Sequence, residues 1–154
     1  MTSVPAVFFL VQYSGQNIAL FSCGLFSGAA IYISLTECPP RTSLALVDLL
    51  ALSRFVAGRT DAVLATLAIV TALTSIVSSF AGGGIGWLVG GIAHALMAAY
   101  IFTDVARVTT MLQSLDSGPD NEVIGKNLMQ RRGLQFAVLS LGGLFAQYLF
   151  ITNR

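Results

Sequence analysis

The chain has 154 residues, of which 55% are hydrophobic and 10% are charged, and its net charge is +1. This near-neutral charge gives no indication of nucleic-acid binding. Four long apolar segments and their connections account for nearly all of the length, which leaves no room for a second, water-soluble domain. The sequence therefore predicts a single integral membrane domain over residues 1–154.

The four apolar segments each lack Asp, Glu, Lys and Arg. They are approximately residues 16–35, 62–80, 85–102 and 134–151. About 20 apolar residues in a helix cross a hydrocarbon layer of about 30 Å. Backbone groups find no water in that layer, so a crossing segment is either a helix or part of a closed barrel, and these runs lack the alternation of barrel strands. The sequence predicts an all-α bundle of four transmembrane helices.

The apolar run of the first helix begins early, at Val4, and continues through Tyr13. One straight helix from Val4 to Leu35 would be longer than the bilayer is thick. We expect it either to tilt or to begin in the headgroup region, with Tyr13 as an interfacial anchor. Pro39 and Pro40 are predicted to end this span, because proline lacks the N–H that a helix interior needs.

The first loop is predicted to contain a short helix of its own, approximately residues 44–56, capped by Thr42 or Ser43. Its two charges, Asp48 and Arg54, and its short length prevent it from crossing the bilayer. We expect an interfacial helix at this position.

The second and third spans are joined by residues 81–84, of sequence Ala-Gly-Gly-Gly. Such a short connection predicts a tight hairpin and antiparallel neighbouring helices. After the third span the helical pattern continues to Leu115, which places Asp104 and Arg107 on one helix face, at the same membrane level as Glu37.

A break at residues 117–119 is predicted before the last helix, with Asp120 or Asn121 as its cap. The first turns of this helix carry Arg131 and Arg132, which we expect in the aqueous interface before the apolar run begins.

The basic residues predict the orientation of the bundle. Seven of them lie in the loops 37–61 and 103–133, against Arg154 alone on the other side: Arg41, Arg54, Arg59, Arg107, Lys126, Arg131 and Arg132. Cytoplasmic loops carry an excess of Lys and Arg. Both loops are therefore predicted on the cytoplasmic side and both termini on the opposite side.

Two pairs of glycines with a spacing of four residues predict close helix packing: Gly24 with Gly28, and Gly86 with Gly90. Small residues at this spacing let two helix backbones approach each other. A gap for a flat ligand is the alternative interpretation.

His94 is the only histidine, and it lies near the middle of the third span. A polar residue at that depth turns inward, where a neutral imidazole can donate a hydrogen bond between helices, act as a base or bind a metal. Metal binding is least favoured, because no second histidine and no metal-binding motif is present. No cofactor is evident from the sequence.

Glu37, Cys38 and Arg41 crowd the end of the first helix. The carboxylate and guanidinium are either a solvated anchor at the membrane boundary or a partly desolvated pair in which Glu37 acts as a base.

Residues 27–41, SGAAIYISLTECPPR, resemble the end of the first helix in the anthrone-oxygenase-like family of small four-helix membrane proteins, where GAALYISLVEHPAR is a typical sequence. Glu37, Pro39 and Arg41 match position by position, while Cys38 stands where histidine is common.

The rest of the chain follows the layout of that family with differences. In place of the Pro and Asn that relatives often carry after the third span, this chain has Thr109 and Met111. Residues 132–139 read RGLQFAVL where relatives resemble WGRLHAVR, so Arg132 replaces a tryptophan.

The resemblance implies oxidation of a lipophilic aromatic substrate, such as an anthrone or a quinol-like molecule, within the bilayer. Glu37 or His94 would then be the base and Arg41 would stabilise the anion. The alternative is a non-catalytic accessory or structural subunit of a larger membrane complex or a homo-oligomer, which the glycines and the small soluble surface favour. A transporter is least favoured, since only His94 lies near the midplane.

Overall fold

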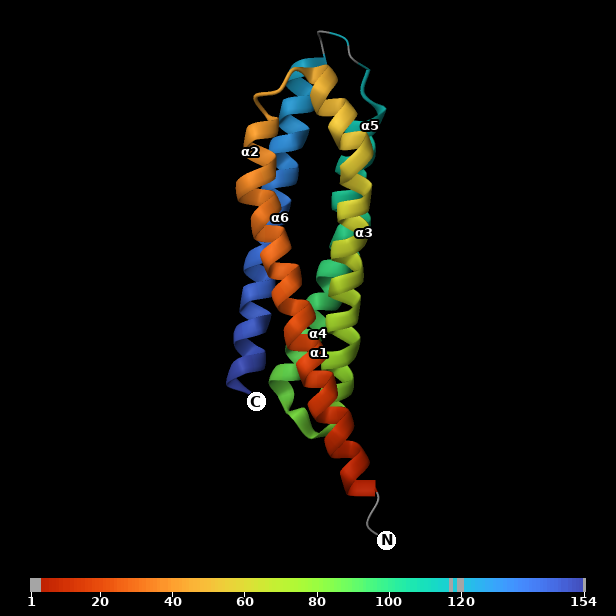
Figure 1. Cartoon of the computed structure of the whole chain (residues 1–154), viewed down its shortest axis with the longest axis vertical. Coiled ribbons are helices and arrows are strands. Elements are labelled where there is room, and N and C mark those ends of the chain that lie inside the picture. The colour runs from red at the N-terminus through yellow and green to blue at the C-terminus, as the bar shows by residue number, and fades with distance from the viewer. Residues whose placement is uncertain (1–3, 117, 119–120, 154) are drawn as a thin grey trace.

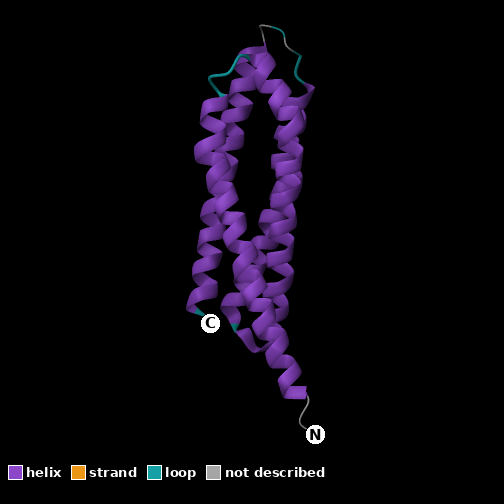
Figure 2. Ribbon diagram, in the orientation of Figure 1, coloured by secondary structure: helices purple, strands orange, loops and turns teal. Residues whose placement is uncertain are grey.

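The computed structural model describes residues 4–116, 118 and 121–153, and every regular element in them is helical (Figure 2). In chain order, with η for a π-helix, the elements are α1 (Val4–Tyr32), η1 (Ile33–Glu37), α2 (Cys38–Arg41), α3 (Leu46–Ser78), η2 (Ser79–Gly83), α4 (Ile85–Tyr100), η3 (Ile101–Val105), α5 (Ala106–Ser114) and α6 (Glu122–Thr152). They form four long rods, each long and apolar enough to cross a membrane: Ala6–Arg41, Leu46–Gly83, Ile85–Ser114 and Glu122–Thr152. The first rod consists of α1, η1 and α2. The predicted all-α membrane bundle is confirmed.

The four rods form a closed ring. Helix α1 packs against α3 and α6, and α4 packs against the same two helices. The connections that follow α2 and α5 lie at one end of the bundle, whereas η2 and the two ends of the described chain lie toward the other (Figure 1). The two basic loops therefore share one end.

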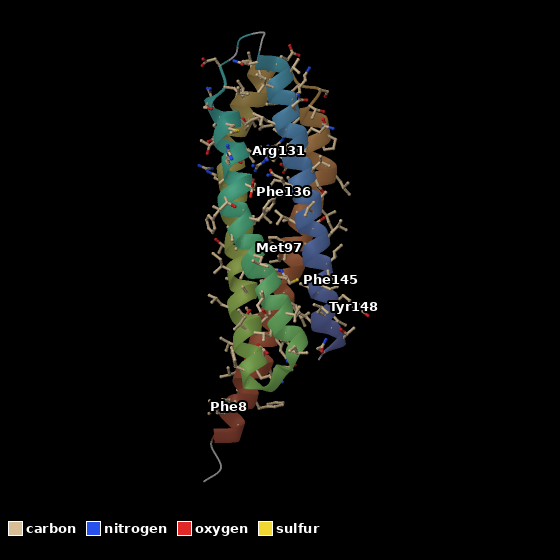
Figure 3. The ribbon with its side chains drawn as sticks, turned by 180° about the vertical axis from the view of Figure 1, so that it is seen from behind. Phe8, Met97, Arg131, Phe136, Phe145 and Tyr148 are labelled. Atoms are coloured by element: carbon tan, nitrogen blue, oxygen red, sulfur yellow. The ribbon has the colours of Figure 1, made fainter. Side chains whose placement is uncertain are left out.

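The surface of the bundle is apolar, as a membrane protein requires. Phe136 is fully buried and points into the bundle, whereas Phe145 and Tyr148 of the same helix are exposed and point outward (Figure 3). Large apolar side chains are exposed along all four rods. In water such a surface would be an aggregation liability, so lipid is the solvent that suits it.

The separate interfacial helix predicted over residues 44–56 is wrong. Helix α3 begins at Leu46 and runs without interruption to Ser78, over 33 residues, which is about 50 Å. No proline lies in this stretch and Gly58 alone does not break a helix. The prediction failed because it ended helices where the apolar run ends, although charged residues such as Arg54 and Arg59 are good helix formers.

The first rod continues through its two prolines. In η1 the Cys38 N–H donates to the Ile33 carbonyl, one residue farther back than in an α-helix. Pro39 and Pro40 then occupy the first turn of α2, where a missing N–H costs little. The rod ends after Arg41 rather than at the prolines.

The predicted hairpin between the second and third spans is confirmed. Gly82 has φ of 106° and Gly84 has φ of 80°, a region that side chains other than glycine rarely enter. A Cβ on Gly83 would also lie only 2.7 Å from the Ser78 carbonyl oxygen. Three glycines are thus the residues this turn requires.

Helix α6 begins at Glu122. The predicted break at residues 117–119 and the candidate cap Asp120 lie largely outside the described residues. Asn121 immediately precedes α6, but its side-chain amide donates to the Asp116 carbonyl at 3.2 Å instead of capping the helix.

Candidate functional site

Glu37 and Arg41 form an ion pair at the end of the first rod. Nη2 of Arg41 lies 2.6 Å from Oε2 of Glu37, and the two side chains are 14% and 22% exposed, respectively. Glu37 closes η1 and Arg41 closes α2, so the pair spans one turn of the rod. Partial burial strengthens such a pair beyond the contribution of a fully solvated one.

A groove of about 540 Å³ lies between the end of the first rod and α6. Its lining residues are Ser34, Leu35, Cys38, Pro39, Thr42, Lys126, Asn127, Gln130, Gly133, Leu134 and Ala137. The two stretches compared with the anthrone-oxygenase-like family, residues 27–41 and 132–139, therefore meet across one groove. A volume of this size suits a small-molecule ligand.

The groove changes from apolar to polar along its length. Leu35, Leu134 and Ala137 lie at the level of the predicted membrane spans, while Lys126 and Thr42 lie beyond them. At Gly133, α6 comes close to the first rod, since a Cβ on this residue would lie 3.1 Å from that of Cys38. This arrangement suits a molecule with an apolar body and a polar edge.

Glu37 and Arg41 do not line this groove themselves. Their neighbours Cys38, Pro39 and Thr42 do, so the ion pair borders the groove. The sequence predicted that Glu37, Cys38 and Arg41 lie at the end of the first helix, but not which of them face the groove.

His94 lies in a separate place. It is fully buried, its Nδ1–H donates to the Gly90 carbonyl at 3.0 Å, and its ring packs against Phe26 and Phe150. Eleven residues separate Phe26 from Glu37 along the first rod, which is roughly 16 Å. The structure does not bring His94 and the Glu37 ion pair into one site.

The Nε2 atom of His94 has no hydrogen-bond partner among the described residues. Because the Gly90 carbonyl can only accept, Nδ1 carries the proton and Nε2 keeps its lone pair. The described residues contain no group of three or more His, Cys, Asp or Glu side chains arranged to hold a metal.

A buried cluster of charged and polar side chains from α3, α5 and α6 was not predicted from the sequence. Arg132 on α6 is 2% exposed, Asp61 on α3 is 7% exposed, and Nη2 of Arg132 lies 2.6 Å from Oδ1 of Asp61. Thr109 on α5 donates to Oδ2 of Asp61 at 2.7 Å and accepts from Nη1 of Arg132. Arg132 also donates to the Ala57 carbonyl and lies over the Phe136 ring. We call Asp61, Thr109 and Arg132 the inter-helix ion cluster.

The placement of Arg132 in the aqueous interface is therefore wrong. Periodicity was the available signal, since each charged residue falls on an apolar helical face. Asp61 lies on the buried face that includes Ala57, Leu64, Ala65 and Ala68, and Arg132 on the one that includes Met129, Phe136 and Leu139. The apolar runs predict the depth of Arg132 in the membrane, whereas its rotation about the helix axis follows from the helical periodicity.

Among the described residues, no ion pair joins Asp104 or Arg107 to Glu37 or Arg41. Asp104 accepts a hydrogen bond from Thr103 at 3.3 Å, and within residues 4–116, 118 and 121–153 no ion pair joins it to Arg107.

The glycines of the two predicted packing pairs have different surroundings. A Cβ on Gly90 would overlap the Phe150 ring, and one on Gly86 would overlap Asn153, so α4 and α6 approach closely there. A Cβ on Gly24 would lie 3.7 Å from the Gln147 amide, and one on Gly28 would meet nothing within 4 Å.

Comparison with known proteins gives no match to a family model, to a curated protein or to a solved structure. The resemblance to the anthrone-oxygenase-like family therefore stays a prediction.

The inter-helix ion cluster should dominate the stability of its end of the bundle. Arg132→Leu leaves the Asp61 carboxylate buried without its partner, and we expect a loss of about 3 to 5 kcal/mol. Asp61→Leu combined with Arg132→Leu should cost clearly less than the sum of the single changes. Thermal unfolding in mild detergent measures this cycle, and additive losses would contradict the pairing.

Gly90 and Gly28 provide a matched test of helix packing. Gly90→Ala should destabilise the protein by about 1 to 3 kcal/mol, because its methyl group overlaps Phe150. Gly28→Ala should be neutral or slightly stabilising, since alanine favours a helix by up to about 1 kcal/mol. Equal effects in thermal unfolding would show that α4 and α6 do not pack as described.

Proposed function

We propose that the protein is a membrane enzyme that oxidises a lipophilic aromatic substrate of the anthrone or quinol type in the groove between the first rod and α6. The observation that carries the proposal is the meeting of residues 27–41 and 132–139 across one groove at the membrane boundary. A substrate dissolved in the bilayer reaches the apolar part of this groove directly, past Leu35 and Leu134.

The reaction uses molecular oxygen as co-reactant. A base removes a proton from the ring CH₂ of an anthrone, and the resulting anion reacts with O₂. One oxygen atom becomes the new carbonyl, and the other leaves as water together with the two hydrogens of the former CH₂ group. The ring carbon is oxidised and O₂ is reduced, so atoms and electrons balance.

Glu37 and Arg41 take the acid–base and electrostatic roles in this proposal. Arg41 holds the carboxylate of Glu37 at 2.6 Å and also supplies a positive charge beside the groove. A substrate anion formed near this pair is stabilised by the guanidinium. His94 packs against Phe26, which lies roughly 16 Å from Glu37 along the first rod, so it supports helix packing rather than the reaction.

A second candidate function is an accessory subunit of a larger membrane complex, and a specific observation favours it. Phe55 and Val123 are each 68% exposed although both lie outside the predicted membrane spans. A partner subunit would cover such side chains. Purification in mild detergent that yields only a bare monomer contradicts this alternative.

We also propose that the end of the bundle carrying α2 and α5 faces the cytoplasm. The positive-inside rule supports this orientation, because six basic residues besides the buried Arg132 belong to that end: Arg41, Arg54, Arg59, Arg107, Lys126 and Arg131.

Anthrone-dependent oxygen uptake by the purified protein tests the enzyme proposal. Glu37→Gln should lower the rate by about 100-fold or more, because a general base contributes about 10² to 10⁴. Arg41→Met should have an effect of about the same size, because it removes the charge that stabilises the anion. Asp48→Asn, an exposed carboxylate on α3, is the control and should leave the rate unchanged. Uptake no faster than in protein-free detergent would refute the proposal.

Labelling with a membrane-impermeant maleimide tests the orientation. Thr152→Cys should react in intact cells, whereas Asp48→Cys should react only after permeabilisation. The unmodified chain is the control, because Cys23 and Cys38 are both buried. The reverse pattern would show that the bundle is inserted the other way round.

A further inference from the structure

Asn127 and Gln130 present free amides to the groove. Both side chains line it, and neither makes a hydrogen bond within the described part of the chain. They are three residues apart on α6, on the same face as Leu134 and Ala137, which also line the groove. One stripe of α6 thus passes from two amides to two apolar side chains.

The opposite wall offers few hydrogen-bond donors. The hydroxyl of Ser34 donates to the Ile31 carbonyl at 3.0 Å, and that of Thr42 donates to the Pro39 carbonyl at 2.7 Å. On α6 itself, Lys126 gives one of its three N–H donors to Glu122, at 2.7 Å. Asn127 and Gln130 therefore carry uncommitted neutral amides in this groove, and each can also accept a hydrogen bond.

We infer that Asn127 and Gln130 determine substrate specificity in this groove by binding a carbonyl or hydroxyl oxygen on the edge of a flat apolar ring system. This inference rests on the proposed function and names the chemical class of its substrate. The ring body lies against Leu35, Leu134 and Ala137 at membrane level, and the oxygen-bearing edge lies toward the interface. A purely hydrocarbon ring of the same shape leaves both amides unused.

Equilibrium binding under argon tests the inference separately from oxidation. The probes are anthrone and 9,10-dihydroanthracene, which share a three-ring skeleton but differ in the carbonyl oxygen. Asn127→Leu and Gln130→Met should each weaken anthrone binding by about 5- to 10-fold, the effect of one neutral hydrogen bond. Binding of dihydroanthracene should change by less than about twofold.

Two further variants locate the site. Ala137→Trp fills the groove and should weaken both probes by more than about tenfold, since either ring body needs that space. Gln113→Met, which alters an amide in a different groove, between α3 and α5, should change neither. Unchanged melting temperatures verify that the variants fold.

Several outcomes would overturn the inference. Anthrone binding unaffected by either amide variant would do so, as would equal losses for both probes, or full binding in Ala137→Trp. Phospholipid that stays in the groove and is not displaced by anthrone would also refute it. If the amide variants weaken anthrone binding but no oxygen uptake occurs, the specificity inference stands and the proposed oxidation is refuted. If oxygen uptake occurs but the amide variants bind anthrone normally, only the specificity inference is refuted.

Discussion

The ion pair between Asp61 and Arg132 is the interaction on which one half of the bundle depends. A lone carboxylate or guanidinium cannot stay ionised in so apolar an interior without a large desolvation cost. Together with the Thr109 hydroxyl and the Ala57 carbonyl they satisfy one another, which makes the cluster tolerable to bury. It also links α3, α5 and α6, because each of the three helices contributes one of its side chains.

The lengths of the rods explain why such a cluster exists. Helix α3 measures about 50 Å, whereas the hydrocarbon layer is about 30 Å thick, so the bundle continues past the membrane. There the rods still pack on one another, but their sequences are free to carry charges. A charged side chain that points outward there, such as Arg59, is exposed. One that points inward, such as Asp61, needs a partner, which is Arg132. The groove between the first rod and α6 lies at this same boundary, which accounts for its change from apolar to polar lining.

The sequence was sufficient for the fold, an all-α bundle of four long apolar helices. Apolar runs and a glycine hairpin determine four antiparallel rods, because few other structures satisfy a backbone in lipid. Helix ends were predicted less well, since α3 and the first rod continue beyond their apolar runs into residues that are merely helix-compatible. The inter-helix ion cluster was missed because hydropathy gives depth but not rotation. The separation of His94 from Glu37 agrees with their predicted levels, mid-span for His94 and the end of the first helix for Glu37.

The π-helical turn at residues Ile33–Glu37 sets the phase of everything around it. A π turn accommodates one residue more than an α turn, and one residue corresponds to about 100° of rotation in an α-helix. Deleting a single residue from this turn would restore α geometry at the cost of swinging Cys38 and Arg41 to a different side of the rod. The length of this five-residue segment thus determines which side of the first rod Cys38 and Arg41 occupy.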